Sequence, residues 1–236
     1  MGRIWRAITW TLWEAADMDK LMRAHLFRMK RDRVFWICMA VMLACSVGMT
    51  LNGCRQAGIM IAQGYQWGLE KYYFTLGPMV GFLAGTFSGL FLGTEHADGA
   101  VRGKLIVGYP RRQVYLSALL VNMLAAGAIT AVWLAGGLVG IPFLGLWKQG
   151  AAAAEVQILI AFGSAMALAS IFTLLGMMVE KKSAGAVGSI VLFMALLLVA
   201  AWGYNALMEP EMTAGFIMTV DGVQTAELTP NPNYVS

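Results

Sequence analysis

Apolar and polar residues alternate along this chain in long blocks. Five apolar stretches contain no Asp, Glu, Lys or Arg, and they lie at about 34–52, 78–94, 114–141, 156–179 and 184–207. A helix rises about 1.5 Å per residue, so that about 17 to 25 apolar residues cross the hydrocarbon core of a bilayer. The pattern predicts an all-α fold, a polytopic membrane bundle of five spans.

The segment before the first stretch, residues 1–33, has a different pattern. Apolar residues and one histidine recur there at helical spacing: Leu21, Met22, His25, Leu26 and Met29. Basic residues fall mainly between them: Lys20, Arg23, Arg28, Lys30 and Arg31. This periodicity predicts an interfacial amphipathic helix whose basic side chains meet anionic lipid. The plainer alternative, a basic anchor for the first span, explains the charge but leaves the periodicity unexplained.

Composition supports the membrane interpretation. The 236 residues are 59% hydrophobic and 13% charged, with a mean hydropathy of +0.66. A water-soluble globule of this size cannot bury so much apolar surface. We therefore divide the chain into a segment at 1–33, a transmembrane domain at 34–207 and a tail at 208–236.

The distribution of Lys and Arg predicts the orientation. Residues 1–33, the loop at 95–113 and the turn at 180–183 together hold 14 of the 17 basic residues. By the positive-inside rule these segments face the cytoplasm, so the N-terminus is expected to be cytoplasmic and the tail external. The tail carries acidic residues and no basic one.

The second span carries a glycine at every fourth position: Gly81, Gly85, Gly89 and Gly93. Residues four apart lie nearly on one helix face, and small residues allow another backbone to approach closely. The ladder therefore predicts a helix-packing groove. The motif leaves its partner open, either another span of this chain or a contact with a second subunit or a transport pathway.

The loop at 95–113 predicts a short helix at the cytoplasmic surface. Asp98 is placed to cap it, Val101 and Leu105 share one face, Gly108 suits its C-terminal end and Pro110 prevents its continuation. A short helix between two spans has the form of a coupling helix.

No catalytic, cofactor or metal site is predicted in this chain. The segment GAVRGK has three residues between its glycines and Leu after the lysine, so it lacks the spacing of a phosphate-binding loop. Glu95, His96 and Asp98 are interpreted as solvated cap residues rather than as metal ligands or an acid–base set. The three cysteines show no zinc or redox spacing.

The run GTEHADGAVRGKLIVGYPRRQVYLS, residues 93–117, follows a basic amphipathic helix and two spans. This arrangement resembles the permease subunit of type-two ATP-binding-cassette (ABC) exporters, especially the bacterial ones near the antibiotic-peptide immunity and multidrug export group. The matching residues are Gly93, Glu95, Gly99, Arg102, Lys104, Leu105, Gly108, Arg111, Tyr115 and Ser117. Outside residues 93–117, the chain resembles this family only in the order and spacing of its predicted spans.

The resemblance implies a subunit of the bacterial cytoplasmic membrane that pairs with a second permease copy, as a homodimer or heterodimer. ATP and magnesium would bind in a separate ABC ATPase subunit, and no nucleic-acid partner is expected. The expected cargo is amphipathic: a peptide, a lipid or a drug. The ATPase-coupling helix would comprise Glu95, Asp98, Gly99, Val101, Arg102, Lys104, Leu105, Gly108 and Arg111.

The chain departs from the family in one respect. The family has six spans, whereas five are predicted here, and Ala214–Val220 is too short to be another. We expect that the sequence stops before a sixth span, the alternative being an incomplete or divergent permease of five spans. In either case Ala214–Val220 is at most re-entrant or interfacial.

Two other functions remain open at this point. A non-transporting immunity or assembly protein, which sequesters a peptide or scaffolds a partner, would have the same spans. An intramembrane enzyme is less favoured, because it needs a nucleophile and base or metal ligands at membrane depth, and both histidines lie outside the predicted spans.

Overall fold

The computed structural model describes residues 18–63, 77–140, 151–179, 181–208, 212–220 and 223–230. Five helices within this part are long and apolar enough to cross a membrane. They are α2 (Arg33–Ala62), α4 (Gly77–Ala97), α6 (Arg111–Gly137, continued by the short 3-10 helix η1, Leu138–Gly140), α8 (Ala151–Met178) and α9 (Lys182–Met208). The predicted bundle of five helices long and apolar enough to span a membrane is confirmed.

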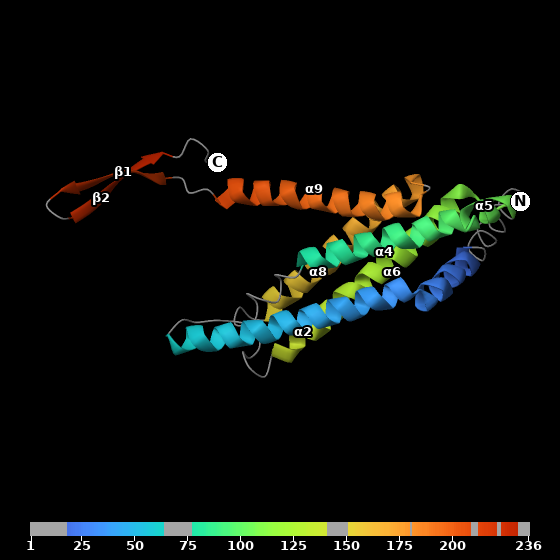
Figure 1. The fold of residues 1–236 in the computed structure, drawn as a ribbon, viewed down its shortest axis with the longest axis horizontal. Helices are drawn as coiled ribbons and strands as arrows, with labels where there is room; N and C mark the ends of the chain where they lie inside the picture. Colours follow the sequence, from blue (N-terminus) through green and yellow to red (C-terminus); the bar gives the residue numbers. More distant parts are fainter. Residues whose placement is uncertain are drawn as a thin grey trace, which may run out of the picture. The chain divides into compact units, whose positions relative to one another are not determined.

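Helices α2, α4, α6 and α8 run in alternating directions and pack on one another (Figure 1). Their core is built from alanine and large apolar side chains, among them Met42, Phe87, Phe91 and Ile129. The short helix α5 (Ala100–Ile106) joins the end of α4 to the start of α6. We call the end of the bundle that carries α5 the α5 end. It also holds the start of α2 and the end of α8.

Several helix boundaries differ from the predicted ones, and two of these differences have local reasons. Helix α2 continues to Ala62, beyond the predicted end at residue 52, because the polar stretch around Arg55 is itself compatible with a helix. The third predicted span ends at residue 141, whereas the α-helix α6 ends at Gly137 and tightens into η1, shortly before a proline at position 142 that cannot continue a helix.

The glycine ladder of α4 packs against other helices of the same chain, and all four of its glycines are buried. A Cβ added at Gly85 would lie 3.0 Å from the ring of Phe172 in α8. A Cβ at Gly89 would lie 2.7 Å from the Cα of Ala186 and 2.8 Å from the carbonyl oxygen of Gly185, at the start of α9. Of the two partners left open by the motif, the structure therefore shows the intramolecular one at these positions.

The chain divides into two compact units, Met1–Val191 and Leu192–Ser236. The second unit contains an antiparallel hairpin of β1 (Met212–Val220) and β2 (Val223–Pro230), with Val220 opposite Val223 and an irregularity between Ala214 and Ile217. The piece Ala214–Val220, expected to be at most re-entrant or interfacial, is thus part of a paired strand. The dipeptide Asp221-Gly222 between two β-prone runs is a hairpin signal that the search for spans overlooked.

Candidate functional site

The amphipathic helix predicted before the first span is present over residues 18–31. Leu21, His25 and Met29 lie on its buried face, and Met29 belongs to the bundle core. Its basic residues Lys20, Arg23, Lys30 and Arg31 are exposed. The apolar face of this helix therefore packs on protein, and contact of its basic side chains with anionic lipid stays a prediction.

This helix turns into α2 through a capped junction. The carboxylate of Asp32 accepts a hydrogen bond from the backbone N–H of Val34 at 2.8 Å, which caps α2. The indole N–H of Trp36 donates to the carbonyl oxygen of Lys30 at 2.8 Å. These bonds fix the angle at which the N-terminal helix meets α2.

Five charged or titratable side chains meet at the α5 end, and we call them the ionic cluster. His25 and Arg28 come from the N-terminal helix, Glu95 from the last turn of α4, Asp98 from the turn that follows and Lys104 from α5. The N-terminal helix is thereby joined at one point to the junction of α4 and α5, about 70 positions further along the chain.

Glu95 is the centre of the cluster and is only 1% exposed. Its Oε1 lies 3.2 Å from Nζ of Lys104, 3.3 Å from Nη1 of Arg28 and 3.0 Å from Nδ1 of His25. The Nδ1–Oε1 pair does not have the geometry of a well-aligned hydrogen bond, so that the His25 contact is mainly electrostatic. Oε2 of Glu95 is buried and has no hydrogen-bond partner among the described residues.

Lys104 also contacts the other ring nitrogen of His25, with Nζ 2.9 Å from Nε2. A lysine ammonium has only donors, so Nε2 accepts this bond and the ring proton of the neutral imidazole lies on Nδ1, toward Glu95. The GAVRGK segment, which lacks the phosphate-loop spacing, is therefore a helix whose lysine is directed at a carboxylate of the same chain.

Arg28 bridges the two carboxylates and closes the cluster. Its Nη2 lies 3.0 Å from Oδ2 of Asp98 while Nη1 contacts Glu95, and its guanidinium stands 5.7 Å from the ring centroid of Phe91. Two cations, Arg28 and Lys104, thus face two anions. Because the charges balance, the cluster joins helices and does not attract a charged ligand.

Two of the sequence interpretations are wrong here. Glu95 is not a solvated cap residue, because α4 extends through it and buries it beneath the N-terminal helix. Asp98 does not cap α5: the N-cap is Gly99, in the left-handed conformation with φ 69°, and no side chain caps it. The carboxylate of Asp98 is held by Arg28 instead.

Sequence analysis did not pair these residues, since His25 and Lys104 are 79 positions apart. The one available signal was the presence of a histidine in the otherwise apolar face of the N-terminal helix. Within the described part of the chain, no group of three or more His, Cys, Asp or Glu side chains is placed to hold a metal ion.

The predicted short helix is present as α5, and its two faces differ. Gly108, at φ 104°, follows its C-terminal end as expected. Val101 and Leu105 share a face, but this face lines a cavity of about 740 Å³ between α5, α6 and α8. The exposed apolar residues are Ile106 and Val107, at 85% and 76%, and the sequence analysis did not single them out.

The remaining predicted residues divide between this cavity and the ionic cluster. Gly99, Arg102 and Arg111 line it, and Arg102 and Arg111 are exposed. Glu95, Asp98 and Lys104 belong to the ionic cluster. The nine residues assigned to one coupling helix therefore lie in three kinds of place: in the ionic cluster, on the wall of the cavity and at the two ends of α5.

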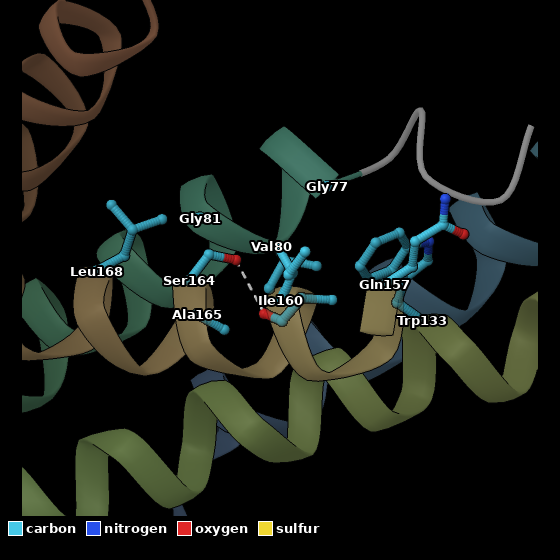
Figure 2. Close-up of a pocket in the computed structure, with 10 residues that line it drawn as sticks. Gly77, Val80, Gly81, Trp133, Gln157, Ile160, Ser164, Ala165 and Leu168 are labelled. Atoms are coloured by element: carbon cyan, nitrogen blue, oxygen red, sulfur yellow. Dashed lines mark hydrogen bonds between the residues drawn. The ribbon is translucent and has the colours of Figure 1, made fainter. Parts of the chain in front are cut away.

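A second cavity, of about 320 Å³, lies at the opposite end of α4 (Figure 2). It is lined by Gly77, Val80 and Gly81 of α4, by Trp133 of α6 and by α8 residues between Gln157 and Leu168. Its lining is mainly apolar, and Ser164 donates its hydroxyl hydrogen to the carbonyl oxygen of Ala161 within α8. This cavity carries no charged side chain among its described lining residues.

Comparison with protein families, with curated proteins and with solved structures finds no match to this chain.

Proposed function

We propose that this protein is the membrane subunit of an ATP-driven exporter, in which a separate ABC ATPase docks on α5. The observation that carries the proposal is α5 itself. It is a seven-residue helix between two candidate spans, it ends in the exposed apolar pair Ile106 and Val107, and Lys104 holds it to α4 and the N-terminal helix.

The exposed pair is suited to docking. Apolar side chains that lie together at the tip of a helix lose little conformational freedom on binding, and they carry a large share of the affinity when a partner pocket covers them. Arg111 and Arg112 follow within five residues and are also exposed. An acidic rim around an apolar pocket would complement this surface.

The ionic cluster supports transmission from α5 to the spans. A displacement of α5 acts on Glu95 at the end of α4 through Lys104. It also acts on the N-terminal helix through Asp98 and Arg28, and from there on α2 through the junction at Asp32. These contacts connect α5 with α4, the N-terminal helix and α2, so that a displacement of α5 can bias the position of all three.

The remaining parts of the proposal follow from charge and from the resemblance. The α5 end faces the cytoplasm, as the Lys and Arg distribution predicts, in a bacterial cytoplasmic membrane. ATP and magnesium bind in the partner, a second permease copy completes the transporter, and an amphipathic peptide, lipid or drug is the cargo. This chain itself performs no catalysis.

Affinity capture from native membranes tests the proposal. The tagged full-length chain is expected to co-purify with a protein that hydrolyses ATP. Replacing the pair by I106N/V107N should weaken capture at least tenfold, since each buried anchor contributes about 1 kcal/mol or more. Absence of ATPase activity in material captured with the correctly inserted chain would refute the proposal.

The matched control is I59N/I61N, which changes two exposed apolar side chains near the end of α2, away from α5. This variant should capture the ATPase as the unmodified chain does. Equal loss in both variants would mean that the effect is not specific to α5, and undiminished capture by I106N/V107N would exclude α5 as the docking element.

A further inference from the structure

The cavity behind α5 combines basic side chains with an apolar wall. Arg102, Arg111 and Lys181 line it, and no Asp or Glu is among its described lining residues. Its volume of about 740 Å³ lies within the range of about 300–1,000 Å³ typical of ligand pockets. We propose that it binds the phosphate of an anionic phospholipid headgroup.

Arg111 and Lys181 carry the electrostatic argument, because Arg102 already has an interaction within the protein. Guanidinium and ammonium groups form short, charge-assisted hydrogen bonds with phosphate oxygens. Arg111 is the first residue of α6, and Lys181, directly before α9, supplies the carbonyl that accepts the N–H of Gly185. The two cations therefore stand at the N-termini of two helices.

The backbone adds to this preference for an anion. The N-terminal end of a helix carries a partial positive charge and amide groups that are free to bind an anion. The N-cap of α6, Pro110, has no side-chain cap hydrogen bond. The C-terminus of α8, at Met178, carries a partial negative charge that cancels the partial positive charge of one of the two helix N-termini. The other N-terminus and the charges of the side chains still attract an anion.

His96 supplies a further polar group at the cavity. It lies on the cavity wall, and its Nε2 is buried with no hydrogen-bond partner among the described residues. Because protein covers this nitrogen, we assign the phosphate contacts to Arg111 and Lys181.

The apolar wall favours a lipid over a soluble anion. Val101, Leu105, Met177 and Met178 line the cavity beside the cations, at the ends of α5 and α8. Inorganic phosphate would use the cations alone, whereas the glycerol and first acyl carbons of a phospholipid would also cover these side chains. Basic pockets between membrane helices are typical sites for anionic headgroups.

A lipid-binding measurement on the delipidated full-length chain in neutral detergent tests the assignment. Native mass spectrometry would count bound short-chain phosphatidylglycerol, with phosphatidylcholine in parallel and inorganic phosphate as competitor. We expect phosphatidylglycerol to bind at least about tenfold more tightly than phosphatidylcholine, and R111Q/K181Q to lose this preference. Inorganic phosphate at equal concentration should not displace it.

The matched control is R112Q, which removes the neighbouring exposed charge that does not line the cavity, and it should retain the preference. Circular dichroism and size-exclusion chromatography check folding. If the double variant does not fold, R111Q and K181Q are measured singly, and each should weaken phosphatidylglycerol binding by several-fold.

Three results would overturn the proposal. Wild-type affinity for phosphatidylglycerol in the folded double variant, or in both single variants, would exclude these cations as ligands. Equal binding of the two lipids would exclude recognition of the headgroup charge. Displacement of phosphatidylglycerol by equimolar inorganic phosphate would exclude a lipid as the source of the phosphate.

Discussion

Substitutions at Glu95 and Lys104 should destabilise the protein unequally, because their surroundings differ. In E95Q the ammonium of Lys104 loses its carboxylate and keeps only Nε2 of His25, while Arg28 keeps Asp98. In K104M the carboxylate of Glu95 still has Arg28 at 3.3 Å. Removing one partner of a buried ion pair costs about 3–5 kcal/mol when the other charge is left uncompensated.

The exposure of the side chains in the cluster lowers the expected free-energy costs. Glu95 is almost fully buried, whereas the side chains of Lys104 and Arg28 are 18% and 30% exposed, so water partly solvates the cations that remain. We expect E95Q to lower the free energy of unfolding by about 3 kcal/mol and K104M by about 1.5 kcal/mol. The double variant should fall short of the sum by at least about 1 kcal/mol, since both changes remove the same contact.

Equilibrium unfolding in mixed micelles with increasing dodecyl sulfate, followed by circular dichroism, measures these differences. The control is D19N, which breaks the Asp19–Arg23 ion pair of 2.8 Å on the exposed side of the N-terminal helix. This change should alter stability by no more than about 0.5 kcal/mol. Additive effects in the double variant, or a loss in D19N as large as in E95Q, would refute a buried cluster centred on Glu95.

Two further predictions concern helix packing. G89A should destabilise the protein by about 1–3 kcal/mol in the same unfolding assay, because the added Cβ meets backbone atoms at Ala186. The control G163A places its Cβ in open space and should have no such cost. Equal effects of the two substitutions would contradict the close contact at Gly89. N122A removes the 2.9 Å hydrogen bond from Asn122 to Thr173 and should lower the free energy of unfolding by about 0.6–1.7 kcal/mol. In a double-mutant cycle the effects of N122A and T173V should not add, and strict additivity would show that the bond contributes nothing.

The sequence by itself determined the elements whose causes are local. The length of each apolar stretch predicted the spans, the spacing of Leu21, His25 and Met29 predicted the N-terminal helix, and Gly108 with Pro110 predicted the end of α5. Period and length depend on neighbouring residues alone, so these predictions needed no knowledge of packing. The hairpin also had a local signal in Asp221-Gly222, but hydropathy does not detect it.

Only the tertiary structure decided which of these elements meet. It placed Glu95 under the N-terminal helix, turned Val101 and Leu105 toward a cavity, and set Gly89 against the start of α9. Arg28 and Glu95 are 67 positions apart, and their contact depends on the angle at which one helix crosses another. That angle results from side-chain packing along the whole interface, and the local sequence pattern of a single segment carries no information about this packing.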